Sequence, residues 1–188
     1  MTTRRLFTAI LPPLRVRQEL LAQLPESRRD DAGLRLTQPS WWHVTLTFTG
    51  SVPEAALPHY RRALAVAADS QPPFPLSIAG GDAFPRLSSG RHVMALLDDP
   101  LGGLPALAHA GRQAALDARI SVEDRAYRPH LTVGRTNRPR DLRGQAGWLQ
   151  GLRTEPWQAT QMVLVETLLD PRGGPAAHRI VDRWELAG

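Results

Sequence analysis

The chain has 188 residues, of which 42% are hydrophobic and 22% charged, values typical of a globular protein rather than a disordered or membrane-embedded one. It contains no cysteine, which excludes disulfide bonds, thiolate nucleophiles and cysteine-ligated metals. The formal net charge is +5 and all 23 basic residues are Arg, which suits bidentate contacts with phosphate groups and favours a polyanionic partner. The sequence has neither a membrane-length apolar run nor a signal-peptide pattern, so we expect a cytoplasmic protein.

Apolar periodicity and turn residues predict a mixed order of strands and helices. In chain order we expect a strand over residues 4–11, a helix opened by Pro12-Pro13, strands over 34–37 and 42–50, a helix over 53–70, strands over 74–84 and 91–97 joined as a hairpin, a helix over 101–120, and strands over 125–135, 161–169 and 179–186. Residues 136–152, rich in Arg, Pro and Gly, are expected to form a loop with one helical turn. The pattern predicts an α+β fold, with residues 1–188 forming one domain of two closely packed halves.

A short sequence that occurs twice is the most informative feature of the chain. It reads His-Val-Thr-Leu at residues 43–46 and His-Leu-Thr-Val at residues 130–133. The two copies lie nearly half a chain length apart. This spacing predicts two similar halves that set their His/Thr faces against one common cleft.

Strand geometry divides each copy into two faces. Successive side chains of a strand point to opposite sides, so His43 and Thr45 share one face while Val44, Leu46 and Phe48 share the other. The second copy divides in the same way. Each polar His/Thr face is therefore expected to be anchored by an apolar face that packs on the core.

Two histidines that face one cleft can act together as a general acid and a general base. The unperturbed pKa of histidine lies near neutrality, so one ring can be protonated while the other is neutral, an arrangement suited to cleaving phosphodiesters. The hydroxyls of Thr45 and Thr132 are placed to bind nonbridging phosphate oxygens. A single His-x-Thr stretch is most often structural, but two matched copies predict a catalytic site containing His43 and His130.

The sequence resembles the two-histidine phosphoesterase superfamily, and within it the bacterial and archaeal RNA 2′,3′-cyclic phosphodiesterases, also called 2′-5′ RNA ligases. The resemblance spans nearly the whole chain and rests on residues 5–12 (RLFTAILP), 43–50 (HVTLTFTG) and 128–135 (RPHLTVGR). It implies a bilobal fold in which two pseudo-symmetric lobes of antiparallel sheet carry helices on the outside and enclose a central cleft. It also implies that no metal or other cofactor is used, with His43 as proton donor and His130 as proton acceptor.

Three further residues are candidates for substrate binding. Arg135 matches an Arg that the family uses to bind phosphate or nucleotide, although strict strand alternation puts it on the side of Leu131. Arg128 shares the parity of His130 and is either a contact for the RNA backbone or a solvated Arg at the end of the sheet. Phe7 is either a core aromatic or a ring at the cleft rim on which a nucleobase stacks.

Two positions near the C-terminus depart from the family pattern. Family members end with a Ser-x-Leu strand, a Gly-rich turn and a Tyr, whereas Glu166 and His178 occupy those positions here. We expect these departures to affect substrate fit rather than reaction type, and we expect His178 to be a surface residue. The other histidines, His59, His92 and His109, lack a partner motif and are expected to have no role in function.

The sequence thus predicts a monomeric enzyme that hydrolyses RNA or nucleotide 2′,3′-cyclic phosphate ends to 2′-phosphomonoesters. The first alternative is a ligase that runs the reverse reaction and joins a cyclic end to a 5′-hydroxyl. The second is a noncatalytic RNA-binding protein on the same fold, against which the intact His and Thr residues argue. A metal hydrolase is disfavoured because neither motif carries an adjacent carboxylate, and a P-loop because Gly80-Gly81 and Gly102-Gly103 lack the required spacing and Lys.

Overall fold

The computed structural model describes residues 2–24, 33–124, 126–170 and 175–188, and these ranges mix helices with strands. The helices are α1 (Leu14–Gln23), α3 (Leu57–Asp69), α4 (Gly103–Asp117) and α5 (Ala146–Gln150). The strands are β1 (Thr3–Ile10), β2 (Leu34–Leu36), β3 (Val44–Pro53), β4 (Phe74–Phe84), β5 (Gly90–Asp98), β6 (His130–Arg140), β7 (Trp157–Ala159), β8 (Gln161–Leu169) and β9 (Pro175–Glu185). The predicted α+β class is confirmed. None of the helices in the described ranges has the length and apolar character needed to cross a membrane.

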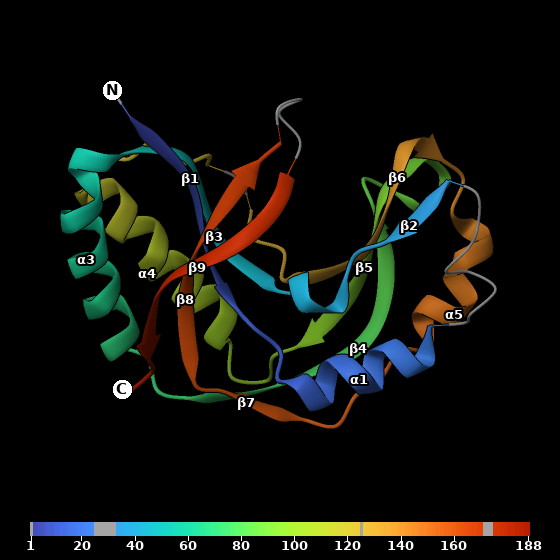
Figure 1. Ribbon diagram of the computed structural model, residues 1–188. Coiled ribbons are helices and arrows are strands. Elements are labelled where there is room, and N and C mark those ends of the chain that lie inside the picture. The colour runs from blue at the N-terminus through green and yellow to red at the C-terminus, as the bar shows by residue number, and fades with distance from the viewer. Residues whose placement is uncertain (1, 25–32, 125, 171–174) are drawn as a thin grey trace.

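The strands form one curled antiparallel path that divides into two lobes (Figure 1). Its order is β7-β4-β5-β6-β3-β1-β8-β9, with β2 added to β6. The two central strands, β3 and β6, are joined only by the pair Val44↔Leu131. Helices α3 and α4 pack on one lobe and α5 on the other, as Figure 1 shows. The lobes therefore meet at the point where the two His/Thr stretches begin.

A close approach between α4 and β3 holds the first motif strand in place. The Thr47 hydroxyl donates to the Ala108 carbonyl of α4 at 3.1 Å. Gly111 makes this approach possible, because a Cβ at that position would lie 2.9 Å from Thr47 Oγ1. Val44, on the core side of the same strand, has no exposed surface. The strand that follows His43 is thus fixed both by burial and by a hydrogen bond to the helix behind it.

The segment around the second motif differs from its prediction. The strand expected over 125–135 begins only at His130 and continues to Arg140, through part of the segment expected to be a loop. It continues because β2 and β5 pair with it, for example at Leu34↔Thr136 and Gly90↔Arg140. The remainder of that segment forms a short 3₁₀ turn and α5, and β7, which pairs with β4, was not predicted at all. The Arg, Pro and Gly content of this segment predicts a loop. The segment is a strand because it pairs with β2 and β5, which are distant in sequence and which its local composition does not reveal.

Glu166, one of the two departures from the family pattern, is held in an ion pair that spans three strands. Its carboxylate accepts hydrogen bonds from Arg4 of β1 at 3.0 and 2.7 Å and from Arg179 of β9 at 3.1 and 2.5 Å. These bonds, those from Arg4 above all, lower the pKa of Glu166 to about 2. A carboxylate at this buried position is therefore compensated by two arginines, which explains how the fold accommodates the departure.

Candidate active site

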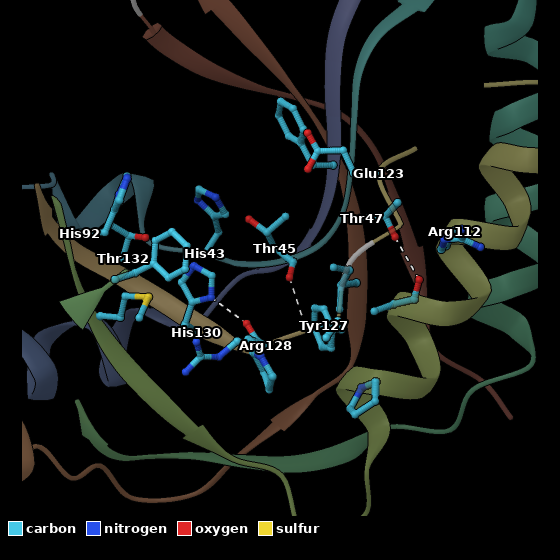
Figure 2. Close-up of a pocket in the computed structure, with 18 of the residues that line it drawn as sticks. His43, Thr45, Thr47, His92, Arg112, Glu123, Tyr127, Arg128, His130 and Thr132 are labelled. Atoms are coloured by element: carbon cyan, nitrogen blue, oxygen red, sulfur yellow. Dashed lines mark hydrogen bonds between the residues drawn. The ribbon is translucent and has the colours of Figure 1, made fainter. Parts of the chain in front are cut away.

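The two His/Thr stretches come together where β3 meets β6. His43 immediately precedes β3 and His130 is the first residue of β6. Continuing the register of the Val44↔Leu131 pair by one residue each way sets Thr132 beside His43 and Thr45 beside His130. All four side chains line one cavity of about 570 Å³ (Figure 2). The junction of the lobes thus places two imidazoles and two hydroxyls on a common surface.

Both histidines are oriented by the same local hydrogen bond. His43 Nδ1 lies 2.6 Å from the Trp41 carbonyl oxygen. His130 Nδ1 lies 2.7 Å from the Arg128 carbonyl oxygen, as Figure 2 shows. Since a carbonyl can only accept, each Nδ1 carries the proton and donates it. In the neutral ring this leaves Nε2 with a free lone pair, ready to take up a proton.

The surroundings of the two rings differ. The hydrogen bond of His43 is partly buried, whereas that of His130 is exposed. Burial lowers the pKa of His43 to about 4, against the opposing effect of its bond to the Trp41 carbonyl and with smaller contributions from the nearby His178, Arg135 and His130. His43 is therefore neutral at pH 7 in the protein alone.

A β-bulge changes which side chains of β3 face the cleft. In the pairing with β1, Ala9 is opposite Thr45 and Thr8 is opposite Thr47, so Leu46 is an extra residue. Beyond this point the alternation is inverted, and Phe48, expected on the core side, is 40% exposed and lines the large cavity. The prediction for Phe48 is wrong because a strict two-residue period does not hold through a bulge.

An equivalent bulge occurs at the matching position of β6. Met94 is opposite Thr132 and Val93 is opposite Gly134, which leaves Val133 as the extra residue. The bulge turns Arg135 to the face of His130 and Thr132, where it lines the cavity. Strand parity alone placed Arg135 on the opposite side, and the bulge removes that objection to Arg135 as a ligand contact. Phe48 and Arg135 thus hold corresponding places in the two lobes.

A second, smaller cavity adjoins the first. It has a volume of about 320 Å³ and is lined by Arg35, Leu36, Thr37, Gln38, Trp41, His43, Thr132, Arg135, Asn137 and His178. Three of these residues, His43, Thr132 and Arg135, line both cavities. A group bound between these three residues would therefore have room on either side of it.

Residues around β2 support the second motif from behind. The Thr37 hydroxyl donates to the Thr132 carbonyl at 2.7 Å and accepts from the Trp42 indole at 2.9 Å. Trp42 has only 2% of its surface exposed. The chain just before His43 is thereby tied to the strand that carries Thr132.

Of the two remaining candidates for substrate binding, Phe7 is buried behind His43, whereas Arg128 lines the large cavity. Phe7 is 4% exposed and lies behind the His43 ring, with a centroid distance of 4.7 Å, so its ring supports His43 and offers no open face to a nucleobase. Arg128 lines the large cavity, and its carbonyl accepts the hydrogen bond from His130. It lies ahead of β6, so strand parity does not determine where its side chain points.

Several residues of the site were not singled out from the sequence. His178, expected on the surface, lines the small cavity next to His43, and both His92 and His109 line the large one. Tyr127 also lines the large cavity and donates from its hydroxyl to the Thr45 carbonyl at 3.1 Å. Only His178 carried a signal in the sequence, because it stands where the family has a Tyr.

The donor set of the site suits acid and base chemistry on an anion. It combines two imidazoles, two hydroxyls and the guanidinium of Arg135 around one opening. Among the described residues, His, Asp and Glu side chains nowhere gather in a group of three able to hold a metal ion. The arrangement can hold a phosphate group and move protons on two sides of it.

Comparison with known sequences identifies relatives over most of the chain. The family model described as the 2′-5′ RNA ligase superfamily matches residues 12–171. The RNA 2′,3′-cyclic phosphodiesterase of Methanothermobacter thermautotrophicus is 28% identical over 179 residues, covering 85% of this chain and 94% of its own length. The protein of the same name from Thermus thermophilus is 27% identical over 191 residues, covering 98% and 91%.

Comparison with solved structures identifies the same architecture. The protein TT0787 of Thermus thermophilus superposes with a TM-score of 0.79 at 27% identity, covering 98% of both chains. Escherichia coli LigT in its apo form superposes with a TM-score of 0.75 at 23% identity, covering 100% of both chains, and at that identity the likeness concerns the fold. The bilobal arrangement predicted from the sequence is confirmed.

Proposed function

The chain belongs to the 2′-5′ RNA ligase superfamily, and we propose that it is a phosphodiesterase that hydrolyses RNA or nucleotide 2′,3′-cyclic phosphate ends to 2′-phosphomonoesters. One observation carries the proposal above the others. The Val44↔Leu131 pair sets His43 and His130, each oriented by the same Nδ1 hydrogen bond, at one cavity together with the two threonines. The names of the relatives from Methanothermobacter and Thermus support the choice of substrate.

In the proposed reaction, water attacks the phosphorus of the cyclic ester in line with the bond to the 3′-oxygen. His130 accepts a proton from the attacking water through Nε2, and His43 donates a proton from Nε2 to the departing 3′-oxygen. The new P–O bond replaces the P–O3′ bond. The products are a 2′-phosphomonoester and a free 3′-hydroxyl.

The remaining groups of the cleft would bind the phosphate. Thr45 and Thr132 each offer a hydroxyl donor to a nonbridging oxygen, and hydrogen bonds to a charged oxygen are stronger than neutral ones. Arg135 contributes a positive charge at the place where the two cavities meet. Arg128 is exposed and lines the large cavity, where it suits a contact with the RNA backbone.

The role of proton donor requires a change at His43 on binding. Burial holds the pKa of His43 near 4, so the free ring is neutral at pH 7. A phosphate anion beside the ring favours its protonated form and raises this pKa. Substrate binding would therefore charge the acid of the reaction.

The test is turnover of adenosine 2′,3′-cyclic phosphate by the purified protein after exhaustive treatment with EDTA. We expect metal-independent hydrolysis and predominantly 2′-AMP, identified by phosphorus NMR or by chromatography against authentic 2′- and 3′-AMP. A loss of activity that a divalent ion restores would contradict the acid–base mechanism. Predominant 3′-AMP would mean that the substrate binds in the opposite orientation.

The small cavity also supports the reverse reaction as a second function. Ligation of a cyclic end to a 5′-hydroxyl needs room on both sides of the phosphate, and the two cavities share His43, Thr132 and Arg135. Incubating the protein with an RNA ending in a cyclic phosphate and a second RNA with a 5′-hydroxyl should yield a 2′-5′ linked product. Absence of that product under conditions of rapid hydrolysis would limit the enzyme to hydrolysis.

A further inference from the structure

The rings of Phe7, Trp41, His43 and His178 form a cluster. The rings of Phe7 and His43 lie 4.7 Å apart, and those of His43 and His178 lie 5.3 Å apart in an edge arrangement. His178 also meets the edge of Phe7 at 5.2 Å and stacks on Trp41 at 5.1 Å, with 21° between the planes. His178 is the member of the cluster that contacts all three others.

His178 reaches this cluster from the far end of the sheet. It lies on β9, two strands beyond β1 in the order β3-β1-β8-β9, so the curl of the sheet brings it back over the first motif. Its ring nitrogens make no hydrogen bond to any of the residues that the structure describes. Ring contacts with Trp41, Phe7 and His43 are thus what hold its orientation.

The cluster makes the packing around the His43 ring different from the packing around the His130 ring. Each ring has one hydrogen bond to a backbone carbonyl, which fixes one nitrogen and leaves the ring free to tilt about it. His43 has two further ring neighbours, Phe7 on one side and His178 on another. In the described part of the chain, His130 has no aromatic ring packed against it in this way.

We propose that His178 is a positioning residue for His43: its ring closes the aromatic cluster that holds the His43 imidazole in the orientation needed for proton transfer and shields it from water. This inference rests on the proposed function, because it assigns the held ring to proton transfer. His178 itself does not exchange a proton with the substrate. It is the shape of the ring that carries the role, since its nitrogens have no hydrogen-bond partner among the described residues.

The charges around His178 are consistent with a neutral ring. It faces His43 from the start of β3, Arg135 from β6 and Arg35 from β2, the last two across the small cavity. Burial, with a smaller contribution from the positive charge of Arg135, lowers the pKa of His178 below its ordinary value. A neutral imidazole next to His43 adds bulk to the cluster without adding a competing positive charge.

The test compares three replacements of His178 in the full-length protein. His178→Ala removes the ring, whereas His178→Phe and His178→Tyr keep a ring and remove the imidazole. The pKa of His43 is measured from the imidazole NMR signals, assigned with His43→Ala, and kcat and KM are measured separately for 2′,3′-cyclic AMP. His59→Ala, on the exposed surface of α3, is the matched control.

We expect His178→Ala to raise the pKa of His43 by at least one unit towards its ordinary value and to lower kcat about tenfold, the scale of a small loss of orientation. Both Phe and Tyr should restore kcat to within a few fold and keep the pKa low, and His59→Ala should change neither quantity. An unchanged His43 pKa in His178→Ala overturns the inference. So does a Phe variant that behaves like Ala, which would mean that the imidazole nitrogens are used. The pKa measurement needs no turnover, so it tests this inference even if the protein does not hydrolyse the cyclic phosphate.

Discussion

The two lobes repeat one local design in two different environments. In each, a histidine donates from Nδ1 to the carbonyl two residues earlier, a threonine follows two residues later, and a bulge comes immediately after that threonine. The bulge turns Phe48 into the cleft in the first lobe and Arg135 in the second. Identical backbone devices therefore deliver an apolar ring on one side of the cleft and a positive charge on the other.

The strand partners of Phe48 and Arg135 also differ between the two lobes. Phe7 pairs with Phe48 across β1 and β3, whereas His92 pairs with Arg135 across β5 and β6. The first lobe thus packs the rings of Phe7 and His178 against its histidine, whereas His130 lies opposite Leu96 and, among the described residues, has no ring packed against it in this way. A near-symmetric fold can thus give its two histidines different neighbours, and burial beside these rings lowers the pKa of His43.

Removing each histidine in turn should have the largest effect on activity. We expect His43→Ala and His130→Ala each to lower kcat by about 10²–10⁴-fold, because each variant lacks the acid or the base of the proposed reaction. Circular dichroism and thermal melting should show that both variants remain folded, since both rings line a cavity. Turnover near that of the wild type in either variant would show that the repeated motif is not the catalyst.

Removing the hydroxyls tests whether the two lobes bind the phosphate equally. Thr45→Ala and Thr132→Ala each lose one hydrogen bond to a charged oxygen, on the order of 1.5–3 kcal/mol, or about ten- to more than a hundredfold in kcat/KM. Thr→Ser at each position keeps the hydroxyl and serves as the control. If Ala and Ser variants have the same kcat/KM, the hydroxyls do not contact the substrate.

Substitutions of Arg135 and Phe48, the residues that the bulges turn into the cleft, should distinguish the effect of side-chain charge on substrate binding from the effect of side-chain shape. Arg135→Gln is expected to raise KM for the cyclic nucleotide roughly tenfold through the loss of a charge-assisted contact. Phe48→Leu keeps an apolar side chain of similar reach, so a change of less than about threefold is expected. Steady-state kinetics with 2′,3′-cyclic AMP give both values, and equal effects would contradict the assignment of the phosphate contact to Arg135.

The pKa of His43 measures how strongly its buried surroundings disfavour the charged ring. NMR titration should place it at about 4 in the free protein and markedly higher when 2′-AMP is bound, because the phosphate stabilises the charged ring. The pH profile of kcat/KM should then be bell-shaped, since only one protonated and one neutral histidine are productive. If 2′-AMP leaves the His43 pKa unchanged, binding does not charge His43, which contradicts its assignment as the proton donor.

The smallest effect is expected at Glu166, outside the cleft. The pKa of its carboxyl is lowered in the folded protein to about 2, so the Arg4 and Arg179 contacts stabilise the fold fully above the unfolded value near 4.5 and progressively less as the pH falls towards 2. Glu166→Gln should cost about 1–2 kcal/mol at pH 7, because the carboxylate is well buried but Arg179 is partly exposed. Urea unfolding at pH 7 and pH 2.5 should show that the difference from the wild type shrinks at the lower pH. Equal differences at both values would show that the ion pair is not the source.

Local patterns in the sequence are enough to predict several parts of this protein. The repeated His-x-Thr stretches, the strand over residues 161–169 and the helix after Pro12-Pro13 follow from side-chain period and turn residues, and the structure has each of them. The Nδ1 hydrogen bonds are equally local, because each joins a histidine to a carbonyl two residues away.

Which side chains lie beside the histidines depends on contacts between segments that are distant in the sequence. The bulges at Leu46 and Val133 depend on how β3 pairs with β1 and β6 with β5, and such pairing between distant segments inverts an alternation that the sequence reads as regular. The position of His178 depends on the curl of the sheet over four strands, which no local pattern encodes. Local patterns therefore identify the two histidines, while long-range strand pairing determines which side chains surround each of them.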